Sequence, residues 1–543
     1  MDNQKINKKI NRRHHIRNIL IPCLLKSGLC GIFTGAWIFL FKTLASHVIE
    51  FSFSAYDYVR ENTKMIPLFL LAAAFVGIFS YLIIKNFPSC RGGGIPTAVT
   101  FIRGFLSFKW VSSVFALFTS SLFTFLGGIP LGNEGPSVQM GCAIGRGTVN
   151  LFSKGNKSWD KYIMTSGACA GFAAATGAPI SAMLFSIEEI HHRFSPLLFM
   201  ATSNAVLASS VTMSVLGNFF NKDTALFHLT IDFILPMRFI WATIAVGAVA
   251  GIVAICFTKL YSLFDKIINM AMKKVPLYVK VVSIFVIVAV WGIFSEGFIG
   301  SGHDIVHDIL SGHNAAWYVL LLYLLVRAVL LFVSNQTGIS GGLFVPSLAF
   351  GAIVGGVFAD MLIKIGIYPA EYKIILVIVG MVAFLASVSR IPITATIFAA
   401  EALSGLTNIV PIAVGVAFSY LVIEAVGVTA FADNIIERKI EESHKGKKIY
   451  VADARLVVCP NSFAVGKEIR DILWPPTCVI SSVYRNDPHS SILGVGDSLH
   501  LKYKTTNKEA TLSVLKSLLG EEQDPEKIIY TRKNDEHYNI PEN

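Results

Sequence analysis

Apolar residues fill most of the first 430 positions in long stretches that polar residues seldom interrupt. Charge-poor stretches recur at 64–84, 162–187, 236–258, 277–295, 315–334, 341–359, 372–389 and 408–423. Several of them reach the roughly 20 residues that a helix needs to cross a bilayer. The pattern therefore predicts an all-α polytopic membrane protein with at least eight apolar segments.

Composition supports this prediction. Of the 543 residues, 53% are hydrophobic and only 15% are charged, which is far too apolar for an ordinary soluble domain. Residues 1–19 form a basic N-terminus that contains one acid and six cations: Lys5, Lys8, Lys9, Arg12, Arg13 and Arg17. The positive-inside rule places this end in the cytoplasm, and no small-residue cleavage pattern of a signal peptide follows it.

The net charge of +11 does not by itself indicate a nucleic-acid partner. The densest basic cluster lies beside a membrane segment, where attraction to anionic lipid explains it equally well. The eight cysteines are scattered, without a C-x-x-C pair or a metal-like histidine spacing. We therefore expect no nucleic-acid partner, no metal site and no required cofactor.

Hydrophobicity falls sharply after Val428, and a charged linker at 431–447 leads to a segment of ordinary soluble composition. Within 448–520, "ARLVVCP", "TCVISSVYRN" and "DSLHLKYK" predict short strands, whereas "VGKEIRDIL" and "KEATLSVLKSLLG" predict helices. These elements are typical of a small cytoplasmic α+β domain. Residues 521–543 are expected to form a polar tail.

Two similar segments indicate an internal repeat. "APISAMLFSIEE" at 178–189 and "IPITATIFAAEA" at 391–402 share Pro-Ile-Ser/Thr-Ala, a Phe six residues after the Pro and a Glu nine residues after it. Upstream, Pro136 precedes Pro179 by 43 residues, and Pro346 precedes Pro392 by 46. Duplicated halves with Gly/Pro-interrupted apolar segments point to a transporter whose site lies between the halves, near the membrane midplane.

Three Gly/Pro breaks stand out within the apolar part: "RGGGIP" at 91–96, "GNEGP" at 132–136 and "GISGGLFVP" at 338–346. Each precedes a stretch that can form a helix, so each predicts a helix N-terminus inside the membrane. Free N–H groups at such ends bind anions, and the glycines let a ligand approach the backbone. Three converging ends would bind an anion without lysine or arginine.

Glu134 lies at the opening of one of these helices, where a negative charge is favoured. Its carboxylate can occupy the site of a permeating anion and leave when it is protonated, which would make it both gate and proton carrier. The alternative is a helix cap or a partly solvated loop acid, although intramembrane acids cost ~2.5–3.5 kcal/mol and are usually functional. Judged on the residues alone, Glu188 and Glu189 are expected to be solvated acids at a membrane boundary.

The segments "GGGIP", "GNEGP", "GACAGFAAATGAPISAMLFSIEE" and "GGLFVPSLAFGA" resemble the signature segments of the CLC anion channel and transporter family. The resemblance covers about residues 20 to 440, with the transport domain expected at 20–430. It implies two inverted halves of tilted, broken helices and a homodimer in membrane lipid with one anion pore per subunit. It also implies the cytoplasmic membrane of a bacterium, with both termini in the cytoplasm.

The resemblance assigns roles to residues as well. It makes Glu134 the external gating glutamate and Glu189 the internal proton-transfer glutamate of the antiporters. It places Gly93, Leu343 and Phe344 at the central anion site, the last two through backbone N–H groups. The full set expected around the anion is Gly93, Gly94, Ile95, Asn133, Gly135, Leu343, Phe344 and Ala432.

The chain departs from the common family pattern in three places. Gly93 stands where a serine hydroxyl usually faces the anion, and Asn133 replaces an arginine before the gate, which removes a positive charge. An ungapped alignment puts Ala432 at the position of a central tyrosine, with Phe431 next to it. These changes resemble the fluoride–proton exchanging branch, whereas "GGLFVP" resembles chloride-type members. Chloride and fluoride are therefore both candidate substrates.

Both glutamates are present, which favours proton-coupled exchange over a passive voltage- or pH-gated chloride channel. The C-terminal domain resembles the TrkA-C (RCK-C) module in "NSFAVGKEI" with Gly466 and "SILGVGDSLHL" with Gly496 and Asp497. Such modules usually dimerise and sense a small ligand, which is unknown here; an assembly domain without a ligand is the alternative.

Three other functions fit the sequence less well. A passive structural membrane protein would leave Glu134 and the duplicated Gly/Pro breaks unexplained. An enzyme is not expected, because the chain has neither H-E-x-x-H nor G-x-S-x-G and few histidines in its apolar segments. TrkA-C modules often accompany potassium transport, but no T-V-G-Y-G filter is present. A cation site would also prefer helix C-termini and carboxylates to glycine-rich N-termini.

Overall fold

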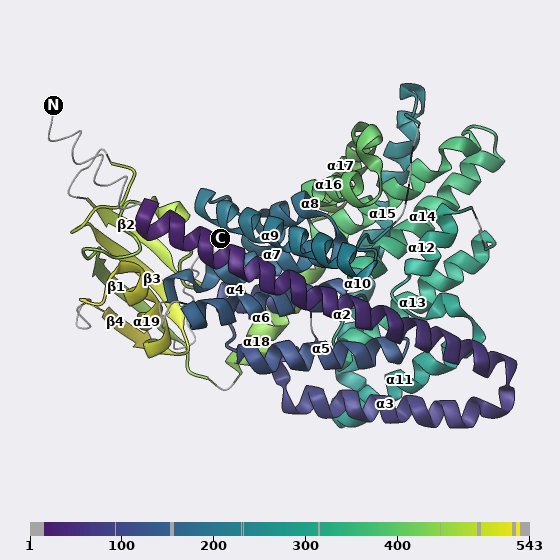
Figure 1. Ribbon diagram of the computed structural model, residues 1–543, viewed down its shortest axis with the longest axis horizontal. Coiled ribbons are helices and arrows are strands. Elements are labelled where there is room, and N and C mark those ends of the chain that lie inside the picture. The colour runs from purple at the N-terminus through teal and green to yellow at the C-terminus, as the bar shows by residue number, and fades with distance from the viewer. Residues whose placement is uncertain are drawn as a thin grey trace.

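The structure is a computed structural model that describes residues 16–92, 94–152, 157–227, 229, 231, 233–312, 315–445, 447–485, 490–523 and 528–532. A large helical body carries a smaller domain with a β-sheet at one end, beside the start of the long helix α2 (Figure 1). Most of the expected basic N-terminus, residues 1–15, lies outside the described part of the chain.

The helices of the body fall into two successive groups. The first comprises α2 (Ile21–Glu61), α3 (Ile66–Asn86), α4 (Ile95–Arg103), α5 (Trp110–Leu126), α6 (Glu134–Phe152), α7 (Asp160–Thr176), α8 (Pro179–Phe185) and α9 (Pro196–Phe220). The second comprises α10 (Ile240–Ala271), α11 (Leu277–Phe294), α12 (His303–Leu310), α13 (Trp317–Thr337), α14 (Phe344–Lys364), α15 (Lys373–Ser389), α16 (Pro392–Ala402), α17 (Ile409–Val426) and α18 (Phe431–His444). Short 3-10 or π turns extend or join several of them, among them η4 (Lys157–Trp159), η5 (Ser186–His191) and η7 (Glu296–Phe298).

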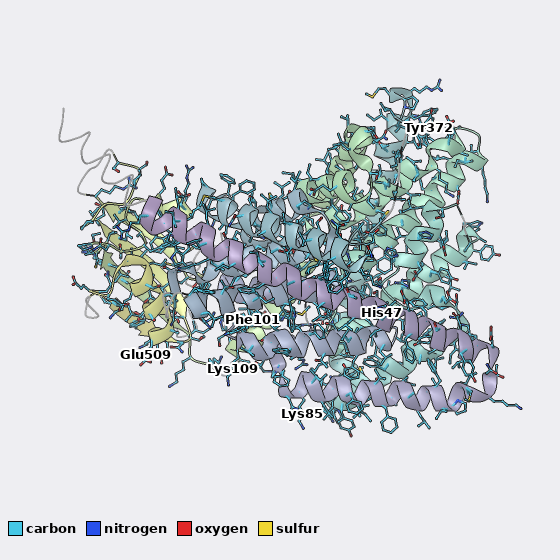
Figure 2. The ribbon with its side chains drawn as sticks, viewed as in Figure 1. His47, Lys85, Phe101, Lys109, Tyr372 and Glu509 are labelled. Carbon is cyan, nitrogen blue, oxygen red and sulfur yellow. The ribbon has the colours of Figure 1, made fainter. Side chains whose placement is uncertain are left out.

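Nine helical segments within the described residues are long and apolar enough to cross a membrane. This agrees with the expected minimum of eight apolar segments and makes the chain an integral membrane protein by length and composition. Helix α3 keeps a row of large apolar side chains exposed, including Leu68, Leu71, Phe75 and Phe79. Figure 2 shows side chains projecting outward from this helix, which ends near Lys85. Such a surface is suited to lipid.

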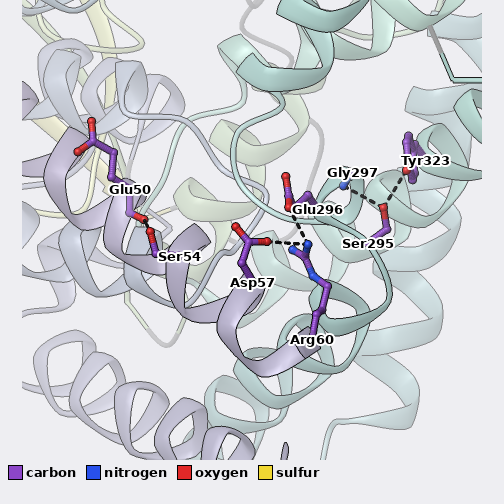
Figure 3. A network of polar contacts seen from close by, with 8 residues as sticks. All are labelled: Glu50, Ser54, Asp57, Arg60, Ser295, Glu296, Gly297 and Tyr323. Carbon is purple, nitrogen blue, oxygen red and sulfur yellow. Dashed lines mark hydrogen bonds and ion pairs between the residues drawn. The ribbon is translucent and has the colours of Figure 1, made fainter. Parts of the chain in front are cut away.

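A polar network fastens the far end of α2 to the turn η7 (Figure 3). Arg60 donates to the Glu296 carboxylate at 2.6 Å and pairs with Asp57 at 2.8 Å. The Ser295 hydroxyl lies 2.8 Å from that of Tyr323 on α13. The end of the first long helix is thereby tied to the second group of helices.

The C-terminal domain is a four-stranded antiparallel sheet with one helix. Its strands are β1 (Tyr450–Val457), β2 (Val479–Tyr484), β3 (Ser498–Thr505) and β4 (Ile528–Arg532), in the order β2-β3-β1-β4, and its helix is α19 (Lys508–Leu519). Alternate side chains of β3 are buried, as expected of a sheet with one covered face. The three predicted strands and the predicted helix at 508–519 are confirmed.

Two expectations for this domain were wrong. The segment 465–473 forms only the short turn η10 (Ile469–Asp471), because Gly466 takes a left-handed φ of 79° and its backbone pairs with Leu493 instead of forming helical bonds. The expected polar tail contributes β4, whose apolar and aromatic residues add an edge strand beside β1.

The expected charged linker also has regular structure, because residues Phe431–His444 form α18. This helix buries Phe431, Ile435 and Ile436, while its charged residues occupy the remaining face. A helix with one apolar face packs against a neighbour, here the membrane body at α4. The body therefore extends through α18 before the sheet domain begins.

The sheet domain docks on the ends of several membrane helices. The Phe463 ring packs against Trp159 of η4 and Tyr162 of α7, with ring centroids 5.1 and 5.6 Å away. The Tyr162 hydroxyl donates to the Asp471 carbonyl, and Lys161 donates to the Trp474 carbonyl at 2.5 Å. Aromatic packing and hydrogen bonds thus join the two domains.

Candidate functional site

The loops that precede α4, α6 and α14 meet at one point, although they lie far apart in the sequence. Gly132 and Gly342, each four residues before the Pro of its repeat, form an antiparallel bridge with N–H to carbonyl distances of 2.8 and 2.7 Å. Equivalent residues of the two repeats thus pair with each other. This reciprocal pairing is what a two-fold relation between the two repeats produces at the axis between them.

Glycine is required where these loops touch. A Cβ atom added at Gly135 would lie 2.6 Å from the Cα of Gly342 and 3.0 Å from the Cα of Gly94. Both neighbours are backbone atoms, which cannot rotate away as a side chain would. The helix starts can approach this closely only because Gly135 and Gly342 lack a side chain.

Gln139, a buried residue of α6 that sequence reasoning missed, holds the first loop in place. Its amide oxygen accepts from the Gly94 N–H at 2.8 Å, and its amide nitrogen donates to the Ser89 carbonyl at 2.8 Å. The Gly94 N–H group therefore already donates to Gln139. Gly94 lines the site, but its N–H group is not free to bind an anion. A buried amide one turn inside an apolar helix is the signal that could have identified it.

A small pocket of about 50 Å³ lies where the helix starts converge. A water-sized particle needs roughly 10–15 Å³ on this measure, so the pocket holds only a few small particles. Four of the expected anion-binding residues, Gly94, Ile95, Leu343 and Ala432, line it together with Glu189. The rest of its lining consists of Gly92, Pro96, Leu131, Asn335, Ile339, Gly341, Gly342, Phe431 and Ile435.

The start of α14 lies at this pocket, and Leu343 lines it. Leu343 and Phe344 stand at the beginning of the helix, where N–H groups have no intrahelical acceptor. Among the described residues, no backbone carbonyl accepts a hydrogen bond from either group. The Phe344 ring packs edge-on against Phe172 and Phe398, with centroids 5.1 Å away, which fixes the backbone at this point. The positive end of the helix dipole thus faces a small cavity.

Glu134 is the first residue of α6 and is only 1% exposed. The backbone amides of Glu134 and Val345 act on its carboxylate. Its Oε2 atom is nevertheless buried without a hydrogen-bond partner of good geometry in the described structure, and so is the Asn133 Oδ1 atom beside it. Asn133, Glu134, Gly135 and Phe344 do not line the pocket itself. They lie directly behind it, since Gly135 touches the two glycines of the other loops. A buried acceptor without a partner is costly and marks a functional position.

Glu189 lines the pocket and is 6% exposed. Its surroundings are charged, because Asp433 of α18 and Arg103 of α4 both act on its carboxylate. The Arg103 guanidinium also donates to the Ile190 carbonyl at 3.1 Å. The expectation from the residues alone, that Glu188 and Glu189 are solvated surface acids, is therefore wrong. Glu188 is engaged elsewhere, through two backbone hydrogen bonds to α16.

Phe431 and Ala432 both line the pocket, so either could stand where the family has a tyrosine. The Phe431 ring packs against Tyr261 with the centroids 4.3 Å apart. No hydroxyl group belongs to the pocket lining within the described residues. Gly93, the remaining expected anion-binding residue, lies outside the described part of the chain.

Lys42, a second residue that sequence reasoning missed, is an isolated cation in the middle of α2. Its Nζ atom donates to the Ala175 carbonyl at 3.2 Å and to the Thr224 carbonyl at 2.6 Å. Its charge acts on Glu134. Helix α2 has a second lysine, Lys26, near its start. A lysine in the middle of a long apolar helix is a sequence signal for function, because intramembrane charges are rare and costly.

No group of three His, Cys, Asp or Glu side chains that could hold a metal ion occurs in the part of the chain that the structure describes. The arrangement is that of a polytopic transport protein built from two related halves around a central site. The sequence profile of the family described as Voltage gated chloride channel matches residues 76–424. The chain belongs to this family, the CLC family.

Individual relatives agree with this assignment. The H(+)/Cl(-) exchange transporter ClcA of Vibrio parahaemolyticus serotype O3:K6 is 25% identical over 449 residues, which cover 80% of this chain and 93% of that protein. ClcA of Klebsiella pneumoniae (strain 342) is 24% identical, with 77% and 89% covered. These relatives are named as transporters and not as enzymes, as the missing catalytic motifs led us to expect.

Solved structures share the fold. A slow cyanobacterial Cl-/H+ antiporter aligns with a TM-score of 0.70 at 21% identity, covering 77% of this chain and 98% of that one. A CLC-type fluoride/proton antiporter aligns with a TM-score of 0.60 at 18% identity, covering 75% and 96%. The predicted fold class, an all-α polytopic CLC body with a small α+β domain, is confirmed.

Proposed function

We propose that this protein exchanges a halide for protons across the membrane. The observation that carries the proposal is the small pocket at three converging helix starts, with one buried glutamate behind it and another in its wall. Helix starts attract an anion, and buried carboxylates can carry protons. The names of the ClcA relatives support the same activity.

In the proposed mechanism, the anion is bound by the N–H groups of Leu343 and Phe344, within the glycine-lined wall that includes Gly94. The Glu134 carboxylate competes with the anion for the positive ends of the helices, because both are negative. Protonation removes its charge, so it withdraws and lets the anion pass. Glu189, in the pocket wall, exchanges protons with the opposite side. Each proton movement is thereby tied to an anion movement.

Chloride is the first candidate for the anion, since the ClcA relatives are named as chloride exchangers. Fluoride is the second candidate. Two features favour fluoride. The described residues that line the pocket carry no hydroxyl group, and the residue before Glu134 is the neutral Asn133. A passive channel is the alternative for the mechanism.

The test is to reconstitute the purified protein in liposomes and to measure chloride efflux, fluoride efflux and proton movement in the same vesicles. Protein-free vesicles are the control. Chloride efflux with proton uptake would support chloride exchange, whereas fluoride-driven proton uptake with little chloride flux would support the fluoride assignment. Flux of either anion without protons would indicate a channel. Potassium flux under a potassium gradient, without anion flux, would indicate potassium transport.

We further propose a homodimer in the cytoplasmic membrane of a bacterium, with both termini and the sheet domain in the cytoplasm. Lys109 lies toward the sheet-domain end of the body (Figure 2), which the positive-inside rule favours for a cytoplasmic side. The TrkA-C-like domain would bind an unknown small ligand or serve in assembly. Cysteine labelling from one side of intact cells would test the orientation, and mass photometry would test the dimer.

A further inference from the structure

Four consecutive carbonyl groups in the loop before α4, at residues 89–92, each accept a hydrogen bond from a different side chain. The pairs are Gln139 to Ser89 at 2.8 Å, Ser340 to Cys90 at 2.7 Å, Lys439 to Arg91 at 3.0 Å and Thr97 to Gly92 at 2.8 Å. The donors belong to α6, to the loop before α14, to α18 and to α4. Free carbonyl oxygens bind cations, so a loop whose carbonyl groups already have donors is suited to an anion.

Gln139 holds this loop at two points. Its amide nitrogen donates to the Ser89 carbonyl and its amide oxygen accepts from the Gly94 N–H, both at 2.8 Å. Gln139 is 1% exposed, so water does not compete for either bond. It belongs to α6, the helix that begins at Glu134. One side chain therefore ties both ends of the loop to the helix of the proposed gate.

Gly94 has a backbone conformation that almost only glycine adopts, with φ 140° and ψ −165°. Gly92 also has a positive φ, of 58°. Glycine is the most mobile residue when nothing constrains it, so such a conformation persists only where neighbouring groups hold it. The Gln139 amide supplies this constraint at Gly94. Both glycines line the pocket, so their conformation decides its shape.

We propose that Gln139 is a positioning residue for the anion site: it fixes the loop before α4, keeps the pocket small and thereby makes the site reject anions larger than a halide. This inference rests on the proposed function. Without the amide of Gln139, the Gly94 N–H and the Ser89 carbonyl lose their buried partners and must turn toward water. The wall formed by Gly92 and Gly94 then moves, and a pocket of about 50 Å³ widens.

The test compares the efflux of a halide with that of nitrate, a larger anion, from liposomes that contain the purified protein. Ion-selective electrodes record both fluxes above those of protein-free vesicles, and the halide is chloride or fluoride, whichever the wild type carries. Gln139→Met keeps the length of the side chain but lacks the amide, and we expect it to lower the ratio of halide to nitrate efflux about fivefold. Thr148→Val on α6 is the control and should keep the ratio, because it removes only a hydrogen bond to the Ile144 carbonyl of the same helix.

A merely structural role would lower both fluxes together, so an unchanged ratio in Gln139→Met would overturn the inference. Should that variant fold poorly, Thr97→Val provides a second test. It removes the donor to the Gly92 carbonyl with little change in shape and should lower the ratio about twofold. An unchanged ratio there would equally overturn the inference. Wild-type halide flux without protons would overturn only the proposed coupling, whereas a wild type without anion flux would overturn both proposals.

Discussion

Glu188 and Glu401 each lie nine residues after the proline of their repeat. Each glutamate caps the start of the helix that belongs to the other repeat. The Glu188 carboxylate accepts from the backbone amides at 393–394, at the start of α16, at 3.0 and 2.6 Å. The Glu401 carboxylate accepts from the amides at 180–181, at the start of α8, with both distances 2.8 Å. Each glutamate neutralises the positive end of the opposite helix, so the repeat stabilises itself through its own symmetry.

We expect Glu401→Ala and Glu188→Ala each to destabilise the body by about 1–3 kcal/mol, because two amides lose a charged acceptor. The measurement is the thermal unfolding midpoint of the detergent-solubilised protein. Glu442→Ala on α18 is the matched control, since this glutamate is exposed. An unfolding midpoint in either cap variant equal to that of the control would contradict the capping role.

Replacement of the gating carboxylate should uncouple the protons. Glu134→Gln carries an amide that mimics the protonated acid, so it cannot release or accept a proton. We expect proton transport to disappear while anion flux is altered or retained, measured as simultaneous anion and proton fluxes in liposomes. Glu188→Gln is the control, because this acid is engaged in a helix cap. A Glu134→Gln protein with normal coupled exchange would refute the gate assignment.

Because the three loops are in close contact, adding one methyl group at Gly135 should strongly reduce anion flux. Gly135→Ala would place a Cβ atom 2.6 Å from the Gly342 backbone, so the helix starts must move apart and the pocket must change shape. We expect at least a tenfold loss of anion flux, roughly the effect of more than 1.4 kcal/mol. Gly356→Ala on α14 is the control, because its new Cβ would meet only a side-chain methyl of Ile309 at 3.1 Å. Equal flux in both variants would argue against the packed arrangement.

Much of this site could be predicted because its key residues lie in short local patterns. Glu134 stands between glycines and a proline, and such a pattern by itself predicts a helix start with an anion-binding end. The repeated Pro and Glu positions also disclosed the two halves. The assigned roles of Glu134, Glu189 and the anion-binding residues remain predictions until transport is measured.

The missed features depend on contacts between distant segments. Lys42 gains its partners from Ala175 and Thr224, more than 130 positions away, and no local pattern indicates them. The segment at 465–473 has a helical composition, but Gly466 and pairing with Leu493 override that propensity. Tertiary contacts decide such cases because helix propensities amount to less than about 1 kcal/mol per residue.

The junction between the two domains contains a buried lysine outside the membrane. Lys467 is 4% exposed, and its Nζ atom donates to the Phe463 carbonyl at 2.6 Å. The Phe463 ring in turn packs on Trp159 of the membrane body. Burial lowers the pKa of Lys467 to about 6, although the nearby Cys23 and Asp471 oppose this shift. At neutral pH the lysine is therefore mainly uncharged while the domain is docked.

This shift predicts that acid loosens the docking of the sheet domain. An exposed lysine titrates near pH 10.4, so between that pH and about 6 the undocked state binds more protons than the docked one. Docking stability should therefore fall as pH falls through this window, by up to about 1.4 kcal/mol per pH unit, and should level off below pH 6. Hydrogen exchange at 463–474 between pH 8.5 and 6.0, corrected for the intrinsic exchange rate, measures it. Lys467→Met should abolish the dependence of docking stability on pH. Lys502→Met, at a more exposed lysine of β3, is the control and should keep it. An unchanged pH dependence in Lys467→Met would rule this mechanism out.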